Sequence, residues 1–341
     1  MNLRERINLL LSHLPTLERW VGPYDEASLL KWLDSELGNS RRLEHWVDGS
    51  RATPRGPVLH VVSGNTPHAA FQTTFRAFLI GCQSWVKIPS AGLPEFERWA
   101  THIPLIELRR ELPEAWKSPE IAIVYGAADT IDFFRNWLST GTRLIEHGPK
   151  LSAAFIFQPT EDTYQNLAQD IMRYGQRGCL SIQMIYAAGD LTDFCEKLSV
   201  GLNSFPEKNH PTLSEAGAVR NERELIRFRA ANGANLQLFE SKNSVDWTIV
   251  LDQENTLLRP GPLSGFVHVA PIPEVISHDT LGPEVEYLST AVLEPISMAG
   301  ELEKIAPPRI CQPGHAQEPG IFWHPDGEMP LAGLVRWRDL G

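Results

Sequence analysis

A cysteine between an expected helix and an expected strand is the first candidate for chemistry. Cys179 follows Gly178 in the segment QRGCLS (residues 176–181), after an amphipathic stretch at 161–177 and before an apolar run at 181–187. A thiol at such a junction, beside a residue without a side chain, can project into a cleft, where its thiolate would be a nucleophile. The alternative is a buried cysteine that serves only as a small apolar side chain.

Three further segments place polar side chains at expected strand ends. Glu146, in EHGPK (146–150), could act as a general base toward water or a thiol. Asn65, in SGNTP (63–67), could donate its amide to a developing oxyanion. Lys87, in VKIPS (86–90), could bind ribose hydroxyls or a phosphate. Their simpler interpretations are a solvated Glu, an Asn that suits a turn, and a Lys whose ammonium group reaches into water.

The other cysteines give no sign of a disulfide or metal site. The four cysteines have no paired spacing and no CxxC, which is typical of a reducing cytoplasm, so we expect a cytoplasmic protein. Cys82 and Cys195 are interpreted as packing residues. Cys311, His315 and His324 have a spacing that fits no common zinc site, so no metal is expected.

Composition indicates a globular protein with a small-molecule or protein partner. The 341 residues, 42% hydrophobic and 21% charged, are enough for two domains of ordinary size. The net charge of −11 argues against nucleic acid as a partner, because such binding requires Lys and Arg to neutralise phosphates. No apolar stretch approaches the roughly 18 residues of a membrane span, and the start, 1–11, lacks the apolar core of a signal peptide.

The elements that must position these side chains alternate between strand and helix. We expect a helical N-terminal extension over 1–55, then strands over 58–62, 84–88, 121–125, 143–145 and 153–157. The intervening helices are expected to end at Gly81, to cover 93–112 with a kink at Pro104, and to run from an N-cap at Asp129 to Leu138. This alternation predicts an α/β domain over 56–158 with a parallel sheet.

A second α/β domain is expected over 159–305. Its predicted elements are a helix at 161–177, a strand at 181–187, a helix at 191–202, and strands at 237–239, 247–251 and 266–269. The last segment, 306–341, is expected to be a C-terminal return or oligomerisation segment. The chain has no GxGxxG, P-loop, HExxH or GxSxG motif.

The order of these features resembles the aldehyde dehydrogenase superfamily. The asparagine turn, the Lys-x-Pro-Ser segment, the glycine-ended third strand, the Glu-x-Gly strand end and Gly-Gln-x-x-Cys follow one another as in that superfamily. Within it, VSGNTPHAAF, GCQSWVKIPS, EHGPKLSAAFI and the terminal WHPDGEMPLAGLVRW are similar to the LuxC-type acyl-CoA reductases of bacterial bioluminescence and related pathways. The resemblance covers about 56–190 and the last 35 residues, and implies two open parallel-sheet α/β domains with the active site between them.

The resemblance also implies roles for individual residues. Cys179 matches the catalytic thiol, Asn65 the oxyanion-binding amide, Glu146 the general base and Lys87 the residue that contacts the adenosine ribose. The other cofactor-binding positions that it implies are Ser63, Gly64, Pro89, Ser90, Gly126 and Ala127. NAD-specific relatives carry a Glu next to the position of Ser90. This chain has Ser90 and Ala91 there, so no carboxylate would repel the 2′-phosphate of NADPH. NADPH is therefore the expected cofactor, with NADH as a possibility.

Two departures from the superfamily pattern keep other functions open. The turn Gly126-Ala127-Ala128 replaces the usual Gly-Ser-Thr, and the later Glu-x-Phe-Gly-Pro has no clear copy, since its nearest stretch, 262–267, lacks the Glu. The expected reaction is reduction of an acyl-CoA, or an acyl group on a carrier protein, to an aldehyde by a homo-oligomer. The alternatives are an oxidative aldehyde dehydrogenase or acyl-phosphate reductase, which retention of Glu146 would suit, and a noncatalytic partner subunit of the same fold.

Overall fold

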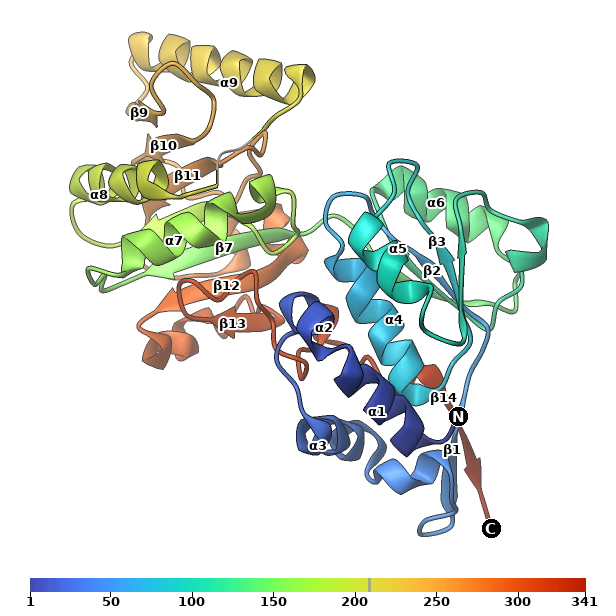
Figure 1. Ribbon diagram of the computed structural model, residues 1–341. Coiled ribbons are helices and arrows are strands. Elements are labelled where there is room, and N and C mark those ends of the chain that lie inside the picture. The colour runs from blue at the N-terminus through green and yellow to red at the C-terminus, as the bar shows by residue number, and fades with distance from the viewer. Residues whose placement is uncertain (208–209) are drawn as a thin grey trace. The chain divides into compact units, whose positions relative to one another are not determined.

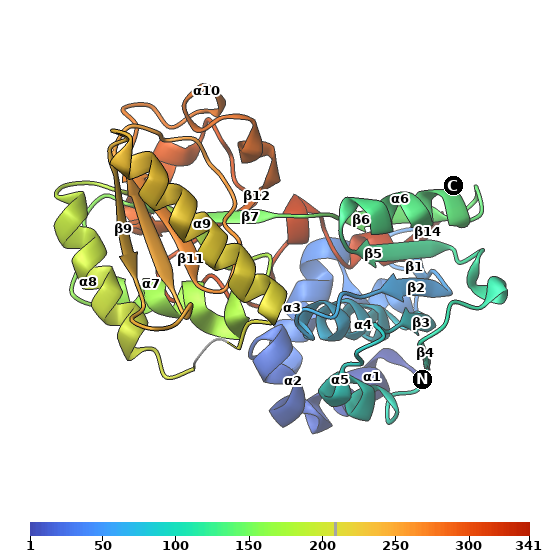
Figure 2. The same ribbon diagram turned by 90° about the horizontal axis from the view of Figure 1, so that it is seen from above.

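The chain divides into two compact units. The structure is a computed structural model, and it describes residues 1–207 and 210–341 (Figure 1). The first unit comprises Met1–Pro149 and Glu318–Gly341, and the second comprises Lys150–Gln317. Each is built on an open sheet with helices packed against it, as Figures 1 and 2 show.

The first unit contains a five-stranded parallel sheet in the order β4-β3-β2-β5-β6. Its strands are β2 (Val58–Val61), β3 (Ser84–Lys87), β4 (Ile106–Arg109), β5 (Ile121–Tyr125) and β6 (Arg143–His147), and its crossover helices are α4 (His68–Ile80), α5 (Pro94–Ala100) and α6 (Ala128–Trp137). The predicted alternation of strand and helix is confirmed, and α4 ends at Gly81, whose φ of 99° suits a glycine. All five strands therefore end at one edge of the sheet.

Two local predictions in this unit are wrong. The helix expected over 93–112 is the short α5 followed by the edge strand β4, because the chain turns at Pro104 and Leu105, where φ is 70°. Helix α6 has Ala127, not Asp129, as its N-cap, and no side chain caps it. Asp129 lies in its first turn instead, where a carboxylate suits the helix dipole.

The N-terminal and C-terminal segments pack together within the first unit. The N-terminal elements are α1 (Leu3–Ser12), α2 (Leu14–Val21), α3 (Glu26–Leu37), η1 (Ser40–Leu43) and β1 (Ser50–Pro54), and β1 pairs antiparallel with β14 (Val335–Asp339). The carboxylate of Glu36 accepts hydrogen bonds from the main-chain amides of Leu331 and Ala332 at 2.7 and 2.9 Å, and from the Trp32 indole at 2.6 Å. The expected extension over 1–55 is therefore an integral part of this unit.

The second unit contains a seven-stranded sheet in the order β13-β12-β7-β8-β11-β10-β9. Only the edge strand β9 runs antiparallel to its neighbour, β10, among the described strands of this sheet. The strands are β7 (Leu151–Ile156), β8 (Ile182–Ala187), β9 (Leu236–Glu240), β10 (Thr248–Asp252), β11 (Phe266–Pro271), β12 (Leu288–Glu294) and β13 (Arg309–Cys311), and the helices are α7 (Thr163–Met172), α8 (Leu191–Ser204), α9 (Leu213–Ala231) and α10 (His278–Leu281).

The unit boundaries differ from the domain limits expected at 158 and 305. Strand β7 lies in the second unit because it pairs with β8 and β12, so the division falls after Pro149. The segment expected over 306–341 is divided after Gln317. Its first part contains β13 and belongs to the second unit, whereas its last part contains β14 and belongs to the first.

Short 3-10 helices complete both units: η2 (Glu114–Trp116), η3 (Arg173–Gln176), η4 (Pro283–Tyr287), η5 (Ile296–Leu302), η6 (Pro325–Gly327) and η7 (Ala332–Leu334).

The core of the second unit lies on both faces of its sheet, as apolar burial requires. On one face, Leu167 and Ile171 of α7 and Phe194 and Leu198 of α8 are buried. Within the described residues, no helix combines the length and apolar character that a membrane span requires.

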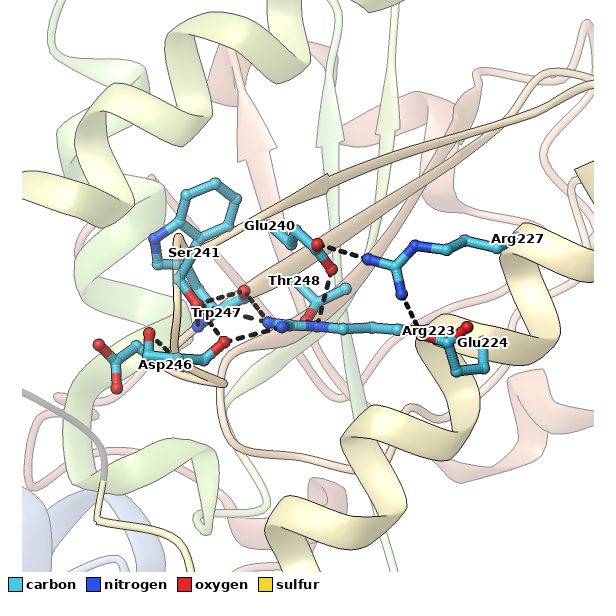
Figure 3. A network of polar contacts seen from close by, with 9 residues as sticks. Arg223, Glu224, Arg227, Glu240, Ser241, Asp246, Trp247 and Thr248 are labelled. Atoms are coloured by element: carbon cyan, nitrogen blue, oxygen red, sulfur yellow. Dashed lines mark hydrogen bonds and ion pairs between the residues drawn. The ribbon is translucent and has the colours of Figure 1, made fainter.

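A buried arginine fastens α9 to the sheet edge formed by β9 and β10 (Figure 3). The Arg223 guanidinium donates to Thr248 Oγ1 at 2.9 Å and to the main-chain carbonyls of Ser244 and Trp247, both at 2.8 Å. It also lies 3.3 Å from a carboxylate oxygen of Glu240. These partners satisfy a cation whose burial would otherwise be unfavourable, and burial lowers the pKa of Arg223.

Candidate active site

Cys179 is the exposed member of the four cysteines, all of which lie in the described part of the chain. Cys82 and Cys195 are buried, and burial raises the pKa of each thiol to about 12. Burial also raises the pKa of Cys311, to about 11. Because the thiolate is the nucleophile, these three are poorly suited to react near neutral pH. The structure thus agrees with Cys82 and Cys195 as packing residues and leaves Cys179 accessible.

A tight turn brings the chain from α7 to Cys179. The expected helix over 161–177 stops at Met172, and Tyr174, Gly175 and Gln176 then adopt left-handed conformations with φ of 57°, 64° and 60°. Left-handed backbone is unfavourable for side chains other than glycine, so this turn needs support from its surroundings.

The Gln176 side chain provides that support. It is fully buried, and its amide nitrogen donates to the carbonyls of Ile182 in β8 and Phe266 in β11, both at 2.8 Å. Its amide oxygen accepts from the Phe266 main-chain amide at 2.9 Å. Three hydrogen bonds therefore fix Gln176, three positions before Cys179, to the adjacent strands β8 and β11.

A second group of contacts lies next to Gly178. The buried Gln317 amide donates to Ser181 Oγ at 2.6 Å and to the Asp170 carbonyl at 3.1 Å. A Cβ atom on Gly178 would lie 3.1 Å from Gln317 Oε1, closer than side chains normally pack. The Asp170 carboxylate accepts from the main-chain amides of Gly314 and Ala316, which ties the loop before Gln317 to α7.

Two serine hydroxyls hold the main chain of Cys179 itself. Its carbonyl accepts from Ser152 Oγ at 3.0 Å and from Ser289 Oγ at 3.5 Å. Ser152 lies in β7 and Ser289 in β12, so the hydroxyls of two neighbouring strands position one carbonyl. The segment around Cys179 is therefore anchored to the amino ends of four adjacent strands, β12, β7, β8 and β11, and such anchoring is what precise placement of a nucleophile requires.

In the first unit, the predicted site residues lie at the carboxyl edge of the sheet. Asn65 and Gly64 follow β2 and are exposed, and Ser63 is half-buried. Gly64 packs against the ring of Pro89, which follows β3, because a Cβ on Gly64 would lie 3.2 Å from Pro89 Cβ. The glycine therefore allows the turn of 63–65 to approach the segment of Lys87 and Ser90 closely.

Gly126 and Ala127 lie at the same edge, between the end of β5 and the start of α6. The Gly126 amide donates to the His147 carbonyl at 3.2 Å, and a Cβ at Gly126 would lie 2.8 Å from Thr130. Because no side chain caps α6, its first amides remain suited to an anion such as a phosphate.

Glu146 forms an ion pair instead of lying alone in the site. Both of its carboxylate oxygens accept from the Arg135 guanidinium, at 2.5 Å each. Arg135 also contacts Asp132 at 2.7 Å, one turn away on α6. The hydrogen bond to Glu146 raises the pKa of Arg135. Action of Glu146 as a general base would therefore require this pair to open.

The neighbouring residue, His147, was missed by the sequence analysis. Its Nδ1 lies 2.6 Å from a carboxylate oxygen of Asp326, and its ring stacks on Tyr125 with centroids 4.3 Å apart. Asp326 belongs to the WHPDG stretch near the C-terminus, so the contact ties that stretch to the end of β6. Both residues lie in segments that the sequence analysis had quoted, EHGPK and WHPDG, but nothing in either segment indicated that the two would be in contact.

Metal ligands do not gather in the described residues: no group of three His, Cys, Asp or Glu side chains is placed to bind an ion. His315 and Cys311 lie in the second unit and His324 in the first.

Sequence comparison decides the family. A family model described as acyl-CoA reductase (LuxC) matches residues 107–337, more than half of the chain. The chain belongs to this family. A relative, the long-chain acyl-protein thioester reductase of Photobacterium phosphoreum, is 24% identical over 243 residues, which cover 62% of this chain and 49% of that protein. The protein of the same name from Aliivibrio fischeri is 23% identical over 328 residues, which cover 80% and 65%.

The chain thus spans about half the length of the first relatives that it matches.

Solved structures agree on the fold. An NAD-dependent benzaldehyde dehydrogenase from Corynebacterium glutamicum matches with a TM-score of 0.67 at 13% identity, over 100% of this chain and 85% of that one. A glyceraldehyde-3-phosphate dehydrogenase from Methanocaldococcus jannaschii, complexed with NADP, matches with a TM-score of 0.66 at 12% identity, over 100% and 90%. The predicted aldehyde dehydrogenase-like α/β fold is confirmed.

Proposed function

We propose that this LuxC-family chain reduces an acyl thioester, either acyl-CoA or acyl-carrier protein, to an aldehyde through an acyl-Cys179 intermediate. The observation that carries the proposal is the exposure of Cys179 on a segment whose flanking groups are anchored to β7, β8, β11 and β12. The relatives' name, long-chain acyl-protein thioester reductase, supports the same class of substrate.

The first step transfers the acyl group to the protein. The Cys179 thiol loses its proton, its sulfur bonds to the acyl carbon, and the bond from that carbon to the carrier's sulfur breaks, so that the carrier leaves and takes up a proton as a thiol. Asn65 and the Cys179 main-chain amide are the proposed donors to the oxyanion. Loss of one such donor typically costs about 100- to 1000-fold in rate.

The second step releases the aldehyde. When bound, NADPH supplies the hydride that reduces the acyl group on Cys179. In the resulting thiohemiacetal oxyanion, an electron pair of the oxygen forms the aldehyde carbonyl, the carbon–sulfur bond breaks with its electrons on sulfur, and the Cys179 thiolate takes up a proton from solvent. The part of the protein is to hold the sulfur and the acyl carbon in place.

The carboxyl edge of the first unit fits the cofactor. The uncapped start of α6 after Gly126 and Ala127 suits the pyrophosphate, and Lys87 and Ser90, at the end of β3, are proposed to hold the adenosine ribose. The absence of a carboxylate at Ser90 supports NADPH, with NADH as the alternative. We therefore assign the cofactor to the first unit and catalysis by Cys179 to the second.

The Arg135–Glu146 ion pair favours reduction over oxidation. Oxidative turnover ends with hydrolysis of the acyl-cysteine, for which a base must activate water. The two hydrogen bonds from Arg135 occupy both carboxylate oxygens of Glu146 and so hinder that task. The role of Glu146 as base, the homo-oligomeric state and the cytoplasmic location remain predictions of the sequence.

The test is incubation of the purified chain with acyl-CoA thioesters of graded length and NADPH, followed by nicotinamide absorbance, with Cys179→Ala as the matched variant. We expect oxidation of NADPH that requires both the thioester and Cys179. NAD(P) reduction with aldehydes alone would assign the chain to oxidation. Inactivity in both directions, with acyl-carrier protein also tried, would favour the noncatalytic subunit.

A further inference from the structure

Three buried arginines of the described chain differ in their partners. Arg6, Arg76 and Arg223 are each 6% exposed. Arg6 donates to the carbonyls of Leu79 and Met1, and Arg223 donates to the groups of the sheet edge described above. Arg76, on α4, has no hydrogen-bond acceptor and no carboxylate within ion-pair distance among the described residues. The donors of this one guanidinium therefore need a partner from outside the described chain.

Arg76 lines a small cavity of the first unit. The cavity has a volume of about 10 Å³ and lies among α2, α3, α4 and the C-terminal segment at 320–321. Helices α2 and α4 pack side by side there (Figures 1 and 2). Such a volume has room for roughly one particle of the size of a water molecule or a chloride ion. The other described lining residues are uncharged: Val21, Trp32, Gln72, Phe75, Gly320 and Ile321.

The surroundings of Arg76 balance its charge only in part. Burial lowers the pKa of the guanidinium, and the smaller effects of Tyr125 and Glu36 raise it. The Glu36 carboxylate already accepts three hydrogen bonds, from α3 and from the C-terminal segment. An arginine keeps its proton at neutral pH and has five N–H donors but no acceptor. A partner with a negative charge would thus satisfy both the donors and the charge of Arg76.

We propose that this cavity binds a small inorganic anion, chloride, and that Arg76 holds it. The anion accepts hydrogen bonds from the guanidinium and fits the size of the cavity, which excludes larger organic anions. Because the lining comes from α2, α3, α4 and the C-terminal segment, the bound anion joins these parts of the first unit and stabilises it. None of the lining residues belongs to the proposed reductase site, so the proposal does not rest on that function.

The first test is urea unfolding of the full chain at rising chloride concentration, with gluconate replacing chloride to keep the ionic strength constant. A ligand that binds only the folded chain makes unfolding less favourable as its concentration rises. We expect the unfolding equilibrium constant to fall about tenfold for each tenfold rise in chloride above the dissociation constant. Arg76→Gln should remove this dependence. Arg4→Gln, at an exposed position of α1, removes the same charge and should retain it.

The second test locates the anion in the wild-type chain, so it does not require a variant to fold. Bromide has the charge of chloride and nearly its size, and its anomalous X-ray scattering identifies it. Crystals soaked in sodium bromide should show an anomalous peak beside Arg76.

Three outcomes would overturn the proposal: unfolding of the wild type that does not depend on chloride, the same dependence in Arg76→Gln, or a cavity without bromide. Each would leave water as the partner of Arg76. Neither test uses a thioester or NADPH, so a failure of the proposed reductase function would be seen separately.

Discussion

Gln176 and Phe266 are joined by a pair of reciprocal hydrogen bonds. The Gln176 side-chain amide donates to the Phe266 carbonyl at 2.8 Å and accepts from the Phe266 main-chain amide at 2.9 Å, as a residue of a paired strand would. The side chain thereby extends the ladder at the start of β11 and fixes the turn that leads to Cys179. Any activity of this thiol should therefore depend on a side chain that does not react.

Gln176→Glu should disturb this turn severely. The change replaces the donor with a charged acceptor at hydrogen-bond distance from the carbonyls of Ile182 and Phe266. We expect the free energy of unfolding to fall by about 2–3 kcal/mol and acylation of Cys179 to slow at least about tenfold. Urea titration and a single-turnover acylation assay measure the two effects. Gln165→Glu, at an exposed position of α7, should leave both unchanged; an equal loss there would contradict the proposed role of Gln176.

Arg135→Gln should release Glu146 and increase hydrolysis. Without the guanidinium, the carboxylate loses both of its hydrogen bonds to Arg135 and becomes available to activate water. We expect the rate of CoA release without NADPH oxidation to rise roughly several-fold, because a carboxylate freed from its ion pair can take a proton from water. The control is Asp132→Asn, which removes the other partner of Arg135 but keeps the pair with Glu146. Unchanged hydrolysis in Arg135→Gln would remove the argument that this ion pair favours reduction.

Arg223→Met should loosen α9 from the sheet edge. The apolar chain of methionine fills part of the same space but removes the guanidinium donor of Thr248 and of the carbonyls of Ser244 and Trp247, which then keep only the longer hydrogen bonds from Ser241. We expect a loss of on the order of 2–3 kcal/mol in the free energy of unfolding. Hydrogen exchange should locate the increased opening in α9 and β9. Arg220→Met, on the exposed side of α9, is the control and should change stability by less than about 0.5 kcal/mol.

Acid should destabilise the first unit through His60. Burial lowers the pKa of this imidazole from 6.5 to about 3. Between these values the unfolded chain binds a proton that the folded chain does not, so stability falls as the pH falls, by up to about 1.4 kcal/mol per pH unit. His60→Gln should reduce this slope in urea titrations between about pH 5 and 7. His45→Gln, at an exposed position, should not, and equal slopes in all three proteins would contradict the assignment.

The fold could be predicted where strand and helix alternate with clear apolar patterns. The strands around Val58, Ile121 and Ile182 and the helix ended by Gly81 follow from local sequence, and the order of chemically distinctive turns placed the chain in its family. The prediction over 93–112 was wrong because β4 is a half-exposed edge strand, whose pattern is weaker than that of a buried one.

Contacts between distant segments could not be predicted. Nothing near Glu146 indicated that Arg135 would bind it, and nothing near His147 indicated Asp326, 179 positions later. Helix α9 was also missed, because its charged sequence has little apolar periodicity and its buried polar anchor, Arg223, reads as a solvent-exposed residue. Sequence patterns thus singled out Cys179 as the candidate nucleophile, whereas the contacts that support its segment could be found only in the structure.

The pairing of β1 with β14 determines the order in which the two units can finish folding during synthesis. The second unit occupies one continuous stretch, Lys150–Gln317, so all of its strands have been made before residue 318. The first unit lacks β14 and the amides that bind Glu36 until residues 331–339 leave the ribosome. The unit that starts first therefore finishes last, and a chain that terminated near residue 320 would contain every strand of the second unit but would lack β14 of the first.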